Sequence, residues 1–142
     1  METEVKRILV VDDQPEIREL VSATVSLIAV EEEYETLHAA NGREAIEIAR
    51  RTMPDLILMD VMMPEMNGLE ATRVLKADPE TRRCTILLLT AMGQKADHQN
   101  GLEFGADGYV VKPFSPTELM ATIKRFTEGT RPVPAGPSAG ER

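Results

Sequence analysis

Residues 55–64 read DLILMDVMMP, and this stretch decides the fold. Its apolar residues at 56–59 form a continuous run, which is typical of a strand buried on both faces of a parallel sheet. The run ends at Asp60, although burying a carboxylate without a partner is costly. A core strand that ends on a polar side chain recurs elsewhere in the chain, which indicates that the strand ends form a site.

Four other apolar runs predict strands, at 8–11, 34–39, 86–89 and 109–111. Apolar residues at helical spacing predict helices at 17–28, 69–77 and 96–104, and after the capping residues Asn41 and Ser115. The helix at 96–104 contains Gly101, which costs ~1 kcal/mol relative to Ala. The alternation of strand and helix predicts an α/β fold with a five-stranded parallel sheet, right-handed crossovers and helices on both faces.

The composition suits one domain of 142 residues with an aliphatic core. The net charge of −8 argues against a nucleic-acid or anionic-membrane surface, since both favour clustered Lys and Arg. Cys84 is the single cysteine, so we expect a small buried side chain and neither a disulfide nor a thiolate cluster. No apolar run reaches the ~18 residues of a membrane span, and no signal peptide is recognisable, so we expect a cytoplasmic protein. We expect a folded domain at 1–128, and a disordered tail or the start of a linker at 129–142, which is rich in Pro, Gly and Ser.

Polar side chains follow four of the predicted strands. Asp12 and Asp13 follow the first, Asp60 the third, Thr90 the fourth and Lys112 the fifth. Each has a simpler explanation alone, such as a helix cap, a strand end or a surface lysine. Because the carboxyl ends of parallel strands meet at one edge of a sheet, where open α/β sheets bind ligands, we expect the five side chains to converge.

Three clustered carboxylates repel one another, and a hard divalent cation relieves that repulsion. A ligand set made only of oxygen favours Mg²⁺, and Mn²⁺ also suits it, whereas His38 and His98 lie elsewhere in the sequence, so zinc is disfavoured. A carboxylate can accept a phosphoryl group as an acyl phosphate, while Lys112 and Thr90 hold its other oxygens. The residues therefore predict Mg²⁺-dependent phosphoryl transfer.

Four motifs carry a family resemblance: VVDDQPE at 10–16, LILMDVMMPEMNG at 56–68, LLLTA at 87–91 and GADGYVVKPF at 105–114. With them, the chain resembles the receiver domains of two-component response regulators over residues 6–127, most closely the single-domain, chemotaxis-receiver-like type. The resemblance implies a doubly wound, flavodoxin-like sheet with strand order 2-1-3-4-5 and five helices.

The resemblance also implies a metal site. Asp60 would accept the phosphoryl group, and Asp13 and Asp60 would bind Mg²⁺ directly together with the backbone carbonyl of Met62. Asp12 would act on the metal through water.

Other implied roles concern the switch and the backbone. Thr90 would bond the phosphoryl group and shift on phosphorylation, Lys112 would pair with a phosphoryl oxygen, and Tyr109 would swing inward as the switch aromatic. The alternative for Tyr109 is a packed, half-buried strand residue. The Lys112–Pro113 peptide resembles the family's cis bond, and Gly68 is expected to be a turn glycine with positive φ.

The resemblance favours a phosphorylation-controlled binding module over an enzyme. A sensor histidine kinase or a histidine phosphotransfer protein would supply the phosphoryl group, and a separate protein would receive the signal, with no direct contact to nucleic acid or membrane. One alternative is a haloacid-dehalogenase-like phosphatase, but its D-x-D pattern is replaced here by Asp12-Asp13-Gln14. The other is a degenerate receiver that serves only as a scaffold, although all the expected site residues are present.

Two methionines lie near the expected chemistry. Met62 and Met92 stand two residues after Asp60 and Thr90, at positions that flank the attacking water in the family. We expect these bulky side chains to slow the loss of the phosphoryl group, the alternative being ordinary loop filling.

Overall fold

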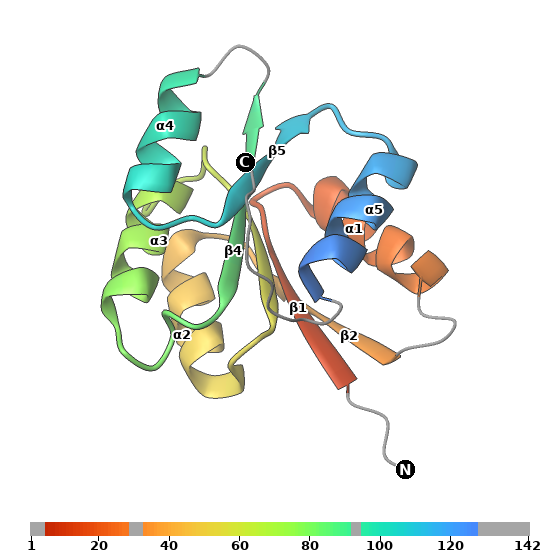
Figure 1. The fold of residues 1–142 in the computed structure, drawn as a ribbon, viewed down its shortest axis with the longest axis horizontal. Helices are drawn as coiled ribbons and strands as arrows, with labels where there is room; N and C mark the ends of the chain where they lie inside the picture. The colour runs from red at the N-terminus through yellow and green to blue at the C-terminus, as the bar shows by residue number, and fades with distance from the viewer. Residues whose placement is uncertain (1–4, 29–32, 92–94, 128–142) are drawn as a thin grey trace.

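Strands and helices alternate along the described part of the chain, which in this computed structural model comprises residues 5–28, 33–91 and 95–127 (Figure 1). The strands are β1 (Val5–Val11), β2 (Glu33–Ala39), β3 (Leu56–Asp60), β4 (Thr85–Ala91) and β5 (Gly108–Lys112). The helices are α1 (Pro15–Ile28), α2 (Gly42–Thr52), α3 (Gly68–Ala77), α4 (Lys95–Glu103) and α5 (Pro116–Thr127). All neighbouring strands pair in parallel, in the order β2-β1-β3-β4-β5, which confirms the predicted fold and strand order.

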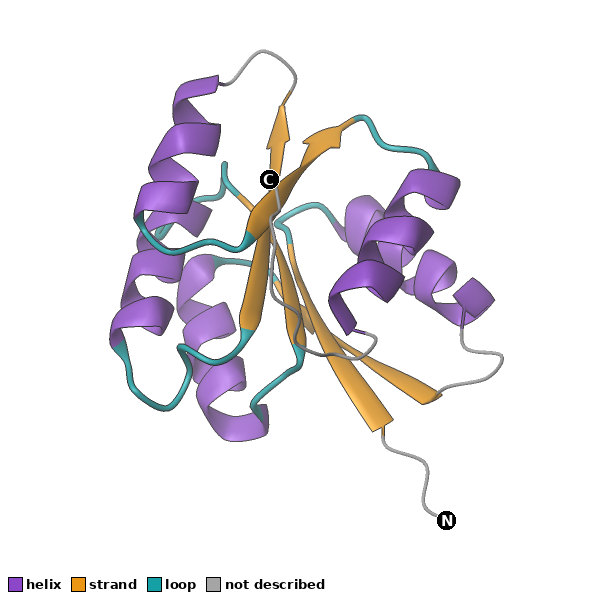
Figure 2. Cartoon of the chain, viewed as in Figure 1, coloured by secondary structure: helices purple, strands orange, loops and turns teal. Residues whose placement is uncertain are grey.

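The sheet lies between two helical layers, with α2, α3 and α4 on one face and α1 and α5 on the other (Figure 2). Successive strand residues point to opposite faces, so a continuous apolar run supplies both layers. In β3, Ile57 and Met59 pack in the core on the α2–α3 side, whereas Leu56 and Leu58 pack with buried residues of α1 and α5. The run at 56–59 is uninterrupted because it serves two cores at once.

The predicted capping residues start their helices by reciprocal hydrogen bonds. The Glu44 backbone N–H donates to Asn41 Oδ1 at 2.9 Å, and the Ala40 N–H donates to Glu44 Oε1 at 2.9 Å. At the start of α5, the Glu118 N–H donates to Ser115 Oγ at 3.1 Å and the Ser115 N–H donates to Glu118 Oε1 at 3.2 Å. Both arrangements satisfy N–H groups that the first turn of a helix leaves unpaired.

The prediction of a positive φ at Gly68 is wrong. Gly68 is the first residue of α3, and the positive φ in this loop belongs to Glu65, at 68°. Gly68 is required for a close approach instead, because a Cβ at this position would lie 2.2 Å from the Asp60 carbonyl oxygen. The glycine thus lets α3 begin directly against the end of β3. The Lys112–Pro113 peptide is cis, as predicted.

Gly101 has a packing reason within α4. It is buried, and a Cβ there would lie 2.4 Å from Leu88 Cδ1, so the glycine lets α4 lie close to β4. Cys84 is 2% exposed in the core, as predicted. No helix in the described residues is long and apolar enough to cross a membrane. Predictions on Met92 and on the segment 129–142 lie outside the described residues, as does the side chain of His98.

Candidate functional site

The parallel strands end at one edge of the sheet (Figure 1), and the residues predicted to bind the metal and the phosphoryl group lie at or just after these ends. Asp12 follows β1 directly, Asp60 is the last residue of β3, Thr90 lies in the last part of β4, and Lys112 ends β5. Asp60, Thr90 and Lys112 therefore lie within their strands, whereas the sequence pattern predicts them just after the strands. β1 and β3 are neighbours although β2 comes between them in the chain, so the chain reverses its direction of winding here, and a crevice is expected at such a point.

A cluster of three carboxylates stands at this crevice. Oxygens of Asp12, Asp13 and Asp60 all lie within 4.8 Å of one another. Asp12 is fully buried, Asp60 is 6% exposed, and Asp13 is exposed. Three oxygen donors at such close range, one of them open to solvent, fit a hard divalent cation that keeps several waters.

Lys112 reaches the cluster from the far edge strand. Its Nζ lies 3.1 Å from Asp60 Oδ1 and 3.3 Å from Asp12 Oδ2. Burial disfavours the charged amine, but Asp60 and Asp12 outweigh that effect and raise the pKa of Lys112. The side chain is therefore a permanent ammonium at neutral pH, and it bridges the two buried carboxylates.

The environment of Asp60 disfavours its ionised form. Burial, and next the negative charge of Asp12, raise the pKa of Asp60, although Lys112 and a hydrogen bond from the Met62 backbone N–H act in the opposite direction. Three carboxylates around one ammonium leave negative charge uncompensated. A further cation is the simplest way to restore the balance.

An open pocket of about 530 Å³ gives access to these groups. Its lining residues are Asp13, Gln14, Asp60, Val61, Met62, Leu89, Ala91 and Lys112. The Met62 side chain is 73% exposed at this pocket. Asp60 therefore faces a pocket that is open to solvent, and the Lys112 ammonium lies on the same wall.

The two predicted switch residues lie on neighbouring strands. Thr90 is 1% exposed in β4, where it pairs in register with Val111 of β5. Tyr109 lies near the start of β5 and is 42% exposed. An exposure of 42% is compatible both with a mobile switch residue and with the alternative of a half-buried strand residue.

Some residues at this edge were not predicted. Gln14 lines the pocket, and its backbone N–H donates to Asp12 Oδ1 at 2.9 Å. Arg18 of α1 donates from Nη1 to the backbone carbonyl of Asp12. Gln14 could have been suspected because it follows the two acids directly, whereas nothing in the sequence distinguishes Arg18 from the other polar residues of α1.

Comparison with known proteins places these features in a family. The family of response regulator receiver domains matches residues 8–124. The chain is 42% identical over 127 residues to the phosphate regulon transcriptional regulatory protein PhoB of Pseudomonas aeruginosa, and 39% identical over 135 residues to the DNA-binding response regulator MtrA of Mycolicibacterium smegmatis. These matches cover 89% and 95% of this chain but 54% and 56% of the relatives, so the chain spans about half the length of the curated relatives it matches.

Solved structures give the same result. The receiver domain of the sensor histidine kinase PA1611 of Pseudomonas aeruginosa, which holds a magnesium ion in its active site cleft, superposes with a TM-score of 0.78 at 32% identity, over 89% of this chain and 100% of that chain. The chemotaxis response regulator CheY4 of Vibrio cholerae superposes with a TM-score of 0.76 at 36% identity, over 87% of this chain and 99% of that chain.

Proposed function

The chain belongs to the family of response regulator receiver domains, which act in two-component systems with histidine kinases, and we propose that Asp60 is its phosphoacceptor. The observation that carries this proposal is the placement of the Lys112 ammonium 3.1 Å from Asp60 Oδ1, beside two further carboxylates. Residues from three distant parts of the sequence thus build one charged pocket that is open to a donor.

Phosphoryl transfer to Asp60 is a direct displacement. A carboxylate oxygen attacks phosphorus, the bond from phosphorus to the donor's histidine nitrogen breaks, and the nitrogen keeps the electron pair and takes up a proton. Lys112 neutralises negative charge on the phosphoryl oxygens, and the Met62 backbone N–H helps to fix the orientation of the Asp60 carboxylate. Positioning and charge neutralisation are the main requirements of this chemistry.

The carboxylates fit a divalent cation, as their spacing and oxygen chemistry indicate. Asp13, Asp60 and the Met62 carbonyl would hold Mg²⁺, or Mn²⁺, with Asp12 acting through water. When bound, the ion supplies positive charge to the phosphoryl oxygens. The magnesium in the similar PA1611 receiver domain supports this assignment.

The signal would leave the site through Thr90 and Tyr109. A phosphoryl group adds about −2 charge beside the carboxylates, and the buried Thr90 hydroxyl would move to bond it. The exposed Tyr109 ring, on the next strand, would then turn inward and change the surface offered to a partner.

The partners we propose are a histidine kinase or a histidine phosphotransfer protein as donor, and a protein as the receiver of the signal, in the cytoplasm. The relatives are named as transcriptional or DNA-binding regulators, and the match covers about half of each. The net charge of −8 makes the chain a poor surface for nucleic acid. The family match favours a regulator over a haloacid-dehalogenase-like phosphatase.

Incubation with acetyl phosphate and Mg²⁺ tests the proposal. We expect the intact mass to rise by ~80 Da, the gain to need the metal, and the Asp60→Asn variant to show none. Asp55→Asn is the matched control, because Asp55 lies just before β3 and accepts from the Arg7 backbone N–H at 2.8 Å, away from the pocket. A gain that persists in Asp60→Asn, or no gain in the wild type, would overturn the assignment.

A further inference from the structure

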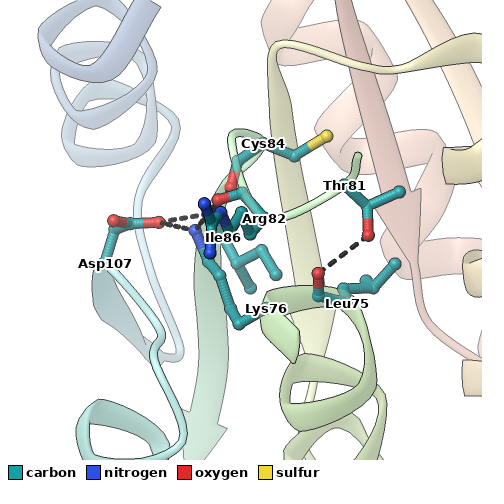
Figure 3. A network of polar contacts seen from close by, with 7 residues as sticks. All are labelled: Leu75, Lys76, Thr81, Arg82, Cys84, Ile86 and Asp107. Atoms are coloured by element: carbon teal, nitrogen blue, oxygen red, sulfur yellow. Dashed lines mark hydrogen bonds and ion pairs between the residues drawn. The ribbon is translucent and has the colours of Figure 1, made fainter. Parts of the chain in front are cut away.

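A second lysine, Lys76, is saturated with hydrogen bonds at the opposite edge of the sheet (Figure 3). Its Nζ donates to the backbone carbonyls of Arg82 at 3.0 Å and Cys84 at 2.7 Å, and to Asp107 Oδ2 at 3.0 Å. The Lys76 side chain is only 16% exposed. An ammonium has three N–H donors, and here each has an acceptor. The lysine therefore ties the end of α3 to the segment before β4 and to the segment before β5.

Asp107 extends this tie into the sheet. Its Oδ2 also accepts from the Ile86 backbone N–H at 2.8 Å, and its own N–H donates to the Ile86 carbonyl at 2.8 Å. Gly105, at φ 109°, lies over the Lys76 stem so closely that a Cβ would stand 2.9 Å from Lys76 Cγ. Asp107 is thus held from two sides immediately before β5 begins.

The pairing at the start of β5 determines the position of Lys112 at its end. Within the described residues, β5 is an edge strand of five residues that pairs only with β4, from Leu87 opposite Gly108 to Ala91 opposite Lys112. A slip of one residue in such a pairing turns every side chain to the other face. At about 3.3 Å per residue, Lys112 lies roughly 17 Å from the Asp107 anchor.

We propose that Lys76 is a positioning residue: by holding Asp107, it fixes the register of β5 on β4 and thereby the place of the Lys112 amine beside Asp60. The consequence for phosphorylation rests on the proposed function, whereas the consequence for the strand does not. Lys76 touches none of the reacting groups and acts only through Asp107 and β5.

Hydrogen exchange of the full chain tests the strand. Lys76→Met keeps an apolar stem and removes the ammonium, and we expect the amides of β5 to exchange about tenfold faster, the effect of losing a charged hydrogen bond. The amides of β1 and β3 report global opening and should change much less. Lys76→Arg should restore much of the protection, and Arg50→Met, which removes an exposed pair with Asp78 in the same region, should leave β5 unchanged.

The rate of phosphorylation by acetyl phosphate tests the site. Lys76→Met should slow it by about 3- to 100-fold at saturating Mg²⁺, since a small displacement of a catalytic group has costs of this size. Lys76→Arg should recover most of the rate, and Arg50→Met should match the wild type. Should Lys76→Met fail to fold, Asp107→Asn, which keeps the shape of the side chain, replaces it.

Two results would overturn the inference. One is faster exchange spread evenly over β1, β3 and β5, which would make Lys76 a general stabilising residue. The other is selective loosening of β5 with an unchanged phosphorylation rate. A wild type that takes up no phosphoryl group would instead refute the proposed function, and the exchange experiment would still decide the role of Lys76 in the strand.

Discussion

Replacing the proposed phosphoacceptor should make the metal-free protein more stable. In Asp60→Asn the amide has nearly the shape of the carboxylate, and its oxygen can still accept from Lys112, while the buried negative charge disappears. The substitution removes repulsion from Asp12 and the cost of burying an ion, and it gives up the attraction to Lys112 at 3.1 Å.

The magnitude follows from these distances. Asp12 and Asp60 have oxygens within 4.8 Å, so their repulsion is at least about 3.5 kcal/mol at an effective dielectric constant of about 20. The ion pair with Lys112 at 3.1 Å is worth about 5.4 kcal/mol on the same scale, before the partial exposure of the lysine weakens it. Burial of the carboxylate costs several kcal/mol more. The balance favours the variant by about 1–2 kcal/mol, or about 3–8 °C in Tm.

The assay is thermal unfolding by far-ultraviolet circular dichroism in EDTA, a suitable probe because the chain has no Trp. Burial and Asp12 raise the pKa of Asp60 in the folded protein, so the ionised carboxylate opposes folding above that pKa. The difference in Tm between the variant and the wild type should therefore be largest at neutral pH. It should decrease as the pH falls through the pKa of Asp60 in the folded protein. Asp55→Asn should give no gain. An Asp60→Asn variant that melts at or below the wild type at neutral pH would refute this balance of charges.

Four other changes have defined outcomes. Lys112→Met should lower the stability of the metal-free protein by about 2–3 kcal/mol, because it leaves the two buried carboxylates without their cation. An unchanged free energy of unfolding in urea would contradict this. Gly68→Ala should cost at least about 2 kcal/mol in the same assay, since its Cβ would meet the Asp60 carbonyl oxygen; a cost near zero would show that α3 can move freely. Glu65→Gly should raise stability by up to about 1 kcal/mol, because Glu65 is exposed at a φ of 68° that glycine adopts without strain, and a loss would argue against strain there. Met62→Ala should shorten the half-life of the phosphorylated protein, measured by intact mass, if the thioether hinders attacking water; an unchanged half-life, or a wild-type lifetime of seconds, would sink that idea.

Much of the fold was predictable because its determinants are local. The run at 56–59 encodes burial on two faces, and the structure divides it between two cores as a parallel sheet requires. The convergence of Asp12, Asp60 and Lys112 follows from the same topology, since parallel strands all end at one edge. Strand lengths were less predictable: β1 begins at Val5, because pairing with β2 extends beyond the apolar residues.

Interactions that depend on backbone groups were not predictable. Gly68 looked like a turn glycine, and only the coordinates distinguish a positive φ from a close approach to the Asp60 carbonyl. Nothing in the sequence distinguishes Lys76 from the other polar residues of α3, because two of its three acceptors are backbone carbonyls, which any residue type provides. Sequence patterns carry information on side chains and their period, but very little on which carbonyl a lysine will find.

Lys76 and Lys112 lie at opposite edges of the sheet, and their polar surroundings differ. Lys76, at the edge where β4 and β5 begin, has an acceptor for each of its donors, and its network gains nothing from an added ligand. Lys112, at the edge where β5 ends, faces two buried carboxylates, with a third nearby, and cannot neutralise them. This excess of negative charge costs folding free energy; a bound cation relieves it, whereas an added phosphoryl group increases it. By the proposed role of Lys76, its hydrogen bonds hold β4 and β5 in register. The charges at the other ends of these strands can therefore remain unbalanced.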